Sequence, residues 1–264
     1  MGKGSWSGIW EMFAALVFYD LVTTMVMIMW KDGEVLAVQC VSALVAGAVF
    51  LFFYIRKKKA EQRGEPVEKK VWKNHLSCFQ IISLAMFGIV LSLSINGLID
   101  QIHLKSIFPG YRQTAQAIAA PPLWLQILAA GVVIPWTEEL IFRGLVLSRL
   151  RKAMPAWLAV LLQGLVFGFV HGQLVWIVYA TLFGLLLGYV RLRTDSLKAS
   201  ILLHMGFNLS SFFIGIVFYL APQNFLGQLS VTLLGGIMLA GFLSIAFQGL
   251  KQGPDEEEPS EWEN

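Results

Sequence analysis

The sequence contains few charged residues. Asp, Glu, Lys and Arg make up 14% of its 264 residues, whereas soluble domains usually carry about 25%. Hydrophobic residues make up 56%, and the mean hydropathy is +0.66. One aqueous core cannot bury that much apolar surface. The composition therefore excludes an ordinary soluble domain and indicates that lipid surrounds most of the chain.

The sequence has only two cysteines and no signal-peptide cleavage motif. Cys40 and Cys78 lie in or at the edge of apolar stretches, so we expect two apolar packing residues and no disulfide framework. The first apolar stretch runs from about Ile9 past Met29. It is longer than the core of a signal peptide and no small-residue cleavage site follows it, so we expect it to remain as a membrane span.

Long apolar runs dominate the rest of the chain. A membrane-spanning helix needs about 20 apolar residues, and eight runs approach this length. The fifth and sixth are short and are separated only by His171, Gly172 and Gln173, so we expect a broken or re-entrant helix pair within 155–190. The sequence thus predicts an all-α, polytopic transmembrane helix bundle. The eight runs are 9–30, 34–55, 76–99, 123–147, 155–171, 173–190, 199–220 and 226–249.

The positions of Lys and Arg predict the orientation, because these residues are enriched on the cytoplasmic side. With eight alternating spans, all 20 basic residues except Lys31, Lys105 and Arg112 fall on one side of the membrane or just beneath it. We therefore expect both termini in the cytoplasm of a multi-pass cell-membrane protein, in a prokaryotic plasma membrane.

The chain shows one domain. We expect residues 1–252 to form a single transmembrane domain whose core, 123–220, carries the polar motifs described below. Residues 253–264 are acidic and lack a hydrophobic face, which predicts a disordered tail. Gly184 and Gly188 form a small-xxx-small pair, which indicates close helix packing.

Charged residues inside an apolar run need a reason, because a charge at mid-bilayer costs roughly 2.5–3.5 kcal/mol on insertion scales. The fourth run contains Glu138, Glu139 and Arg143. Glu139 and Arg143 are four residues apart and can pair on one helix face. Glu138 is rotated from Glu139 by about 100°, so it has no obvious partner on its own helix. A purely structural cluster of ion pairs is the alternative interpretation.

Two other runs add polar residues that suit amide hydrolysis. His171 ends the fifth run, and His204 and Asn208 lie one turn apart in the seventh. A lone membrane histidine is usually a packing residue, but two histidines, an asparagine and an unpaired glutamate on three runs favour a site. Glu138 would act as general base toward water, with a histidine helping to orient it. The tetrahedral intermediate needs hydrogen-bond donors, which His204 and Asn208 would supply.

These motifs resemble a known family. Glu138-Glu139-x-x-x-Arg143, Phe167-x-x-x-His171 and His204-x-x-x-Asn208 are similar, in residues and in order, to the motifs of the CPBP family. This family contains the type II CAAX prenyl proteases and the bacteriocin-processing and immunity (Abi) proteins. The resemblance covers about a third of the chain. It implies a metal-independent intramembrane endopeptidase in which Glu138 and His171 activate water, His204 and Asn208 form the oxyanion site, and Glu139 and Arg143 support them.

The resemblance also implies the partners. We expect a peptide or a lipidated CAAX-type protein as substrate, membrane lipids around the chain, and neither a cofactor nor a nucleic acid partner.

Three alternatives to this function remain. Glu138, His171 and His204 would make a His₂Glu zinc set, although no His-Glu-x-x-His is present. The same cavity would also suit a non-catalytic scaffold or immunity protein that binds a peptide, or a proton-coupled carrier, although no internal repeat supports a carrier.

Two features do not fit easily. With straight helices, Glu138 and His204 would lie about 10–14 Å from the cytoplasmic edge and His171 about 24 Å from it. The residues meet only if the fifth span starts late, tilts or is re-entrant, and we favour a late start after an interfacial segment at 150–157. Asp20 is an acid in the middle of the first run without any motif. It would either bond to a neighbouring helix or line the substrate cavity.

The orientation can be tested by labelling. A single cysteine introduced at Lys58 and one introduced in the C-terminal tail should both react with a membrane-impermeant reagent only from the cytoplasmic side. If the two cysteines react from opposite sides of the membrane, the eight-span arrangement is wrong.

Overall fold

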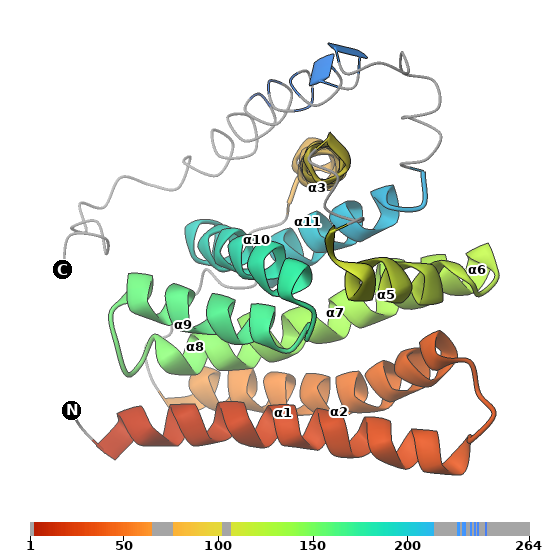
Figure 1. Cartoon of the computed structure of the whole chain (residues 1–264). Coiled ribbons are helices and arrows are strands. Elements are labelled where there is room, and N and C mark those ends of the chain that lie inside the picture. Colours follow the sequence, from red (N-terminus) through yellow and green to blue (C-terminus); the bar gives the residue numbers. More distant parts are fainter. Residues whose placement is uncertain are drawn as a thin grey trace.

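The computed structural model describes residues 3–64, 76–101 and 107–213, with scattered positions between 226 and 241. All regular secondary structure in these residues is helical (Figure 1). The predicted tail 253–264 and most of the eighth run lie outside the described residues, as does the basic 65–75 segment.

The described part contains four helices that are long and apolar enough to cross a membrane. Two of them lie in α2 (Val35–Gly64) and α3 (Cys78–Gln101), a third is a composite helix at Leu123–Leu150, and the fourth is α10 (Leu174–Thr194). The helix α1 (Lys3–Met29) adds a shorter apolar stretch, Phe13–Met29. The described part of the chain is thus all-helical, and its long apolar helices support a membrane protein, as the composition predicts.

The composite helix has two wide turns. It consists of α6 (Leu123–Gln126), the π-helical segment η1 (Ile127–Val133), α7 (Ile134–Glu139), a second π-helical segment η2 (Leu140–Val146), and α8 (Leu147–Leu150). Pro135 accounts for the first wide turn, because proline lacks an N–H and its ring clashes with the carbonyl of the preceding turn. The N–H of Ile134 accordingly bonds to the carbonyl of Ala129, five residues back. The two π-helical segments flank α7, which carries both glutamates.

A short helical hairpin follows. The helix α9 (Ala156–Phe169) is joined to α10 by a tight turn in which Gly172 has φ +73°. With 14 residues, α9 is about 21 Å long, whereas the hydrocarbon core is about 30 Å thick. This length favours the expectation that the hairpin does not make two full crossings. The amphipathic helix α5 (Pro109–Ala119) lies over the turn, since a Cβ on Gly110 would touch the side chain of Gln173.

The expected difference in depth between Glu138 and His171 is smaller in the structure. The composite helix continues to Leu150 instead of ending at 147. Glu138 therefore lies about 18 Å along the axis from Leu150, and His171 about 23 Å from Ala156. Residues 150–157 comprise the last residue of α8, a turn and the start of α9, and their place at the membrane interface stays a prediction.

Two glycines fix the position of α11 (Leu197–Ser210), which carries His204 and Asn208. A Cβ on Gly88 of α3 would collide with the backbone carbonyl of Leu203, and one on Gly206 with the carbonyl of Ala85. The two helices therefore pack backbone against backbone. This close approach holds the polar face of α11 at a fixed distance from the composite helix.

Substitution of Gly88 tests this packing. Gly88→Ala should lower the free energy of unfolding by about 1–3 kcal/mol, the usual range for overpacking, because backbone atoms cannot move aside as a flexible side chain can. Gly144→Ala is the matched control, since its Cβ would meet only side chains at ordinary contact distances of 3.4–3.5 Å. Thermal unfolding in detergent measures both. Equal stability of the two variants would contradict the close contact of α3 and α11.

Candidate active site

A buried ion pair lies at the centre of the polar residues. The Nη1 atom of Arg143 donates to Oε1 of Glu139 at 2.8 Å, and both side chains are 0% exposed. The two residues are one helical turn apart on the composite helix, as their spacing predicts. The pairing of Glu139 with Arg143 is thus confirmed.

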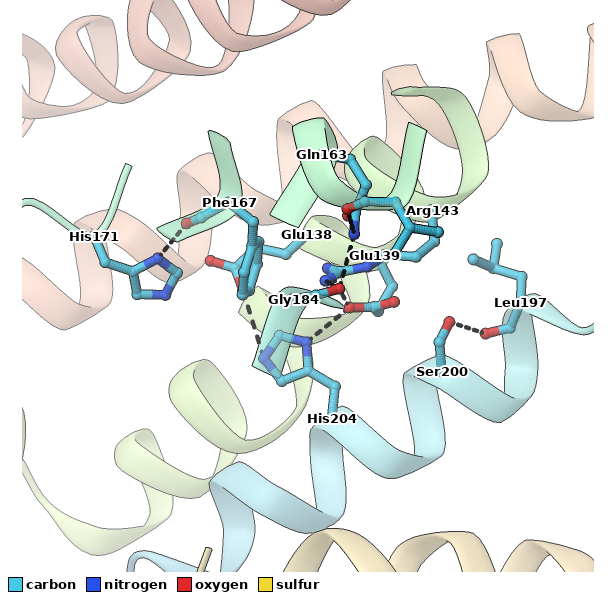
Figure 2. Close-up of polar contacts among 11 residues, drawn as sticks. Glu138, Glu139, Arg143, Gln163, Phe167, His171, Gly184, Leu197, Ser200 and His204 are labelled. Carbon is cyan, nitrogen blue, oxygen red and sulfur yellow. Dashed lines mark hydrogen bonds and ion pairs between the residues drawn. The ribbon is translucent and has the colours of Figure 1, made fainter. Parts of the chain in front are cut away.

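Arg143 is also anchored to the helical hairpin (Figure 2). Its Nη2 atom donates to the carbonyl of Gly184 at 3.1 Å, and the side-chain amide of Gln163 donates to the same carbonyl at 2.8 Å. The guanidinium lies over the ring of Phe167 at 4.4 Å. Sequence reasoning missed Gln163, although an uncharged polar residue in the middle of an apolar run was a signal for it.

His204 lies between the two glutamates. Its Nδ1 atom is 2.9 Å from Oε1 of Glu139, and its Nε2 atom is 3.7 Å from Oε2 of Glu138. The carboxylate of Glu139 accepts a hydrogen bond, so Nδ1 carries a proton and a neutral imidazole presents the lone pair of Nε2 toward Glu138. The ring of His204 packs edge-on against Phe167 and Phe183.

Glu138 differs from its neighbour in its surroundings. Its side chain is 21% exposed, whereas that of Glu139 is fully buried. Its Oε2 atom lies 3.7 Å from Nε2 of His204, a distance longer than a hydrogen bond. Tyr19 of α1 also lies within electrostatic range of Glu138, a neighbour that the sequence did not reveal. Glu138 is therefore the carboxylate that small molecules can reach.

His171 joins the same group of side chains through Phe167. Its Nδ1 atom donates to the carbonyl of Phe167 at 2.7 Å, which leaves Nε2 free to accept a proton. The ring of Phe167 lies 4.9 Å from the ring of His171 and 5.8 Å from that of His204, measured between centroids. Both imidazoles therefore adjoin one aromatic ring, and Figure 2 shows them on the same side of the composite helix as Glu138.

Asn208 lies one turn after His204 on α11 and forms a hydrogen bond with the composite helix. Its Nδ2 atom donates to the carbonyl of Ala130 at 2.9 Å. Pro135 explains why this carbonyl is available: in a π-helical turn the N–H five residues on would bond to it, and Pro135 has no N–H. One amide hydrogen of Asn208 is thus used for packing, and the other is not engaged by any described residue.

Two more observations complete the site. Ser200 is fully buried on α11, donates to the carbonyl of Leu197 at 3.0 Å, and lies beside the carboxylate of Glu139. Serine is common in membrane helices, so its position beside Glu139 was not predictable from the sequence. Within the described residues, no three His, Cys, Asp or Glu side chains form a group that would hold a metal ion.

Comparison with known proteins locates a family domain on these residues. Residues 120–210 match the family model described as Type II CAAX prenyl endopeptidase Rce1-like. A 90-residue stretch is 33% identical to an "Uncharacterized 24.3 kDa protein" of Escherichia coli, covering 32% of this chain and 42% of that protein. No solved structure matches the chain significantly. All six predicted site residues, from Glu138 to Asn208, lie within the matched region.

The two glutamates should differ in their effect on stability. Glu139→Gln leaves the fully buried Arg143 without a counter-charge, and breaking a buried ion pair costs about 3–5 kcal/mol. Glu138→Gln removes no ion pair of comparable length from a partly exposed position, so it should change the free energy of unfolding by less than about 1 kcal/mol. Thermal unfolding in detergent compares them, and a larger loss in Glu138→Gln would contradict the assigned pairing.

Proposed function

We propose that this chain is a membrane endopeptidase of the type II CAAX prenyl endopeptidase family and that it hydrolyses peptide bonds with a water activated by Glu138. The match of residues 120–210 to the model of that family supports the proposal. One observation carries the proposal. Of two adjacent carboxylates, Glu139 is bonded to Arg143 and His204, while Glu138 is partly exposed and lies 3.7 Å from Nε2 of His204. A reactive base needs this kind of unpaired position.

Glu138 acts as the general base. Its carboxylate accepts a proton from water as the water oxygen attacks the carbonyl carbon of the substrate. His171 helps to hold that water, because its Nδ1–H is tied to the carbonyl of Phe167 and its Nε2 remains an acceptor. Protonated Glu138 then gives the proton to the departing nitrogen. One water is consumed, the C–N bond breaks, and a carboxylic acid and an amine are released.

His204 and Asn208 stabilise the tetrahedral intermediate. An oxyanion requires hydrogen-bond donors, and Asn208 retains one amide hydrogen beyond that given to Ala130. His204 donates through Nε2 only when both of its nitrogens are protonated. Its ring lies between the two glutamates, with Nδ1 2.9 Å from Glu139 and Nε2 3.7 Å from Glu138. Glu139 and Arg143 support the site by fixing the imidazole.

The proposal includes the setting of the reaction. The chain forms a bundle of about eight membrane helices in a prokaryotic plasma membrane, with a broken or re-entrant pair at 155–190 and both termini in the cytoplasm. Residues 1–252 form one transmembrane domain. The substrate is a peptide or a CAAX-type lipidated protein, and no metal or other cofactor takes part. The four long apolar helices and the 17 basic residues on one side support this arrangement.

Cleavage assays test the assignment of Glu138. Wild-type protein in liposomes should cleave at least one of a lipidated CAAX-type peptide, a bacteriocin leader peptide and a short signalling peptide. Glu138→Gln keeps the size of the side chain but cannot accept the proton, so the rate should fall about 10²–10⁴-fold. Asn208→Ala should fall by a comparable or smaller factor, about 10²–10³-fold, since it removes one oxyanion donor.

Two controls separate the alternatives. Glu34→Gln changes an exposed glutamate before α2 and should retain full activity. Chelators should leave cleavage intact, whereas loss of activity on chelation and its recovery with zinc would favour the Glu138, His171 and His204 zinc set. If Glu138→Gln protein inserted at normal levels supports full biological function, the cavity is a binding site of a scaffold or immunity protein and the protease assignment is wrong.

A further inference from the structure

One acidic side chain of α1 has no place in the site described above. Asp20 lies on the exposed face of the helix and makes no hydrogen bond or ion pair with any described residue. Its neighbour Tyr19 packs into the core instead. Neither expected role is seen, because Asp20 does not bond to a neighbouring helix and does not face the group around Glu138.

The depth of Asp20 makes this exposure unfavourable. Asp20 lies nine residues before Met29, the last residue of α1, which corresponds to about 14 Å along the axis. If α1 spans the bilayer as proposed, this is close to the middle of a hydrocarbon core about 30 Å thick. A short Asp side chain cannot reach the interface from there, unlike Lys or Arg. A charged group so placed needs a partner.

The residues around Asp20 form a regular seam. Five exposed side chains follow one another at spacings of four, three, four and three residues, which places them on one side of the helix. The first, second and last are apolar and 51–57% exposed, and Thr24 lies one turn beyond Asp20. The seam consists of Phe13, Val17, Asp20, Thr24 and Met27. Such spacing suits the close packing of a second helix.

The chain itself has no cation to offer this seam. Among the eight apolar runs, Arg143 is the only Lys or Arg, and it is fully buried against Glu139. A second copy of this chain would bring only the same residues, so two copies packed through the seam would place two acids face to face. Charge complementarity therefore points to a different chain.

We propose that the α1 seam binds a partner transmembrane helix that carries a Lys or Arg near the middle of the bilayer. The basic residue would pair with Asp20, and the apolar residues on either side would pack against the partner. This inference rests on the proposed spanning arrangement of α1 but not on the protease activity.

Designed single-span peptides test the proposal. Full-length protein labelled with a donor dye at the exposed Cys78 is reconstituted in liposomes with acceptor-labelled Leu/Ala helices that carry Lys, Leu or Glu at their centre. The Lys peptide should associate at least about tenfold more tightly than the Leu peptide, a difference of 1.4 kcal/mol. Asp20→Asn should abolish this preference, and Asp20→Lys should transfer it to the Glu peptide.

Matched controls make a failure interpretable. Asp32→Asn removes the same charge just beyond the end of α1 and should leave the preference for the Lys peptide unchanged. Equal binding of all three peptides overturns the proposal, as does Asp20-dependent association of donor- and acceptor-labelled copies without any peptide. So does reaction of a Val17→Cys variant with an aqueous thiol reagent, because α1 would then lie outside the bilayer. Cleavage by wild-type protein and its loss in Glu138→Gln are measured separately and do not depend on these outcomes.

Discussion

The buried pair of Glu139 and Arg143 is the interaction on which the rest of the site depends. Two charges removed from water are stable only when their remaining hydrogen-bonding groups are satisfied. Here the carboxylate also binds His204 of α11, and the guanidinium binds the carbonyl of Gly184 in α10. One ion pair therefore joins three helical elements, and the position of the imidazole follows from it.

Glycine makes these connections possible. The carbonyl of Gly184 accepts bonds from both Arg143 and Gln163, which is feasible because no side chain covers it. A Cβ on Gly188, one turn later, would lie 2.6 Å from Nε2 of Gln163. The small-xxx-small pair thus serves close packing, as its spacing predicts, and the side chain of Gln163 lies against Gly188.

The sequence predicted the local pairs and the class of fold, because both depend on spacing along the chain. The pair Glu139–Arg143 follows from a separation of four residues, and the membrane bundle from apolar runs. The bridges from Gln163 to Gly184 and from Asn208 to Ala130 were not predictable, since they depend on how helices cross. The end of the fourth run at Leu150 was misplaced at 147 because Ser and Arg at the membrane edge do not mark where a helix stops.

Three acids in apolar runs look alike in the sequence, and their surroundings separate them. Glu139 is fully buried and paired with Arg143, so its role is to hold the helices together. Glu138 is rotated by about 100° from it, so its carboxylate is partly exposed and lies 3.7 Å from His204 instead of bonding to the cation. Asp20 faces outward from α1 and makes no hydrogen bond or ion pair with any residue in the described part of the chain. The function of a membrane carboxylate is therefore decided by the helix face on which it lies and by the charge that the face meets.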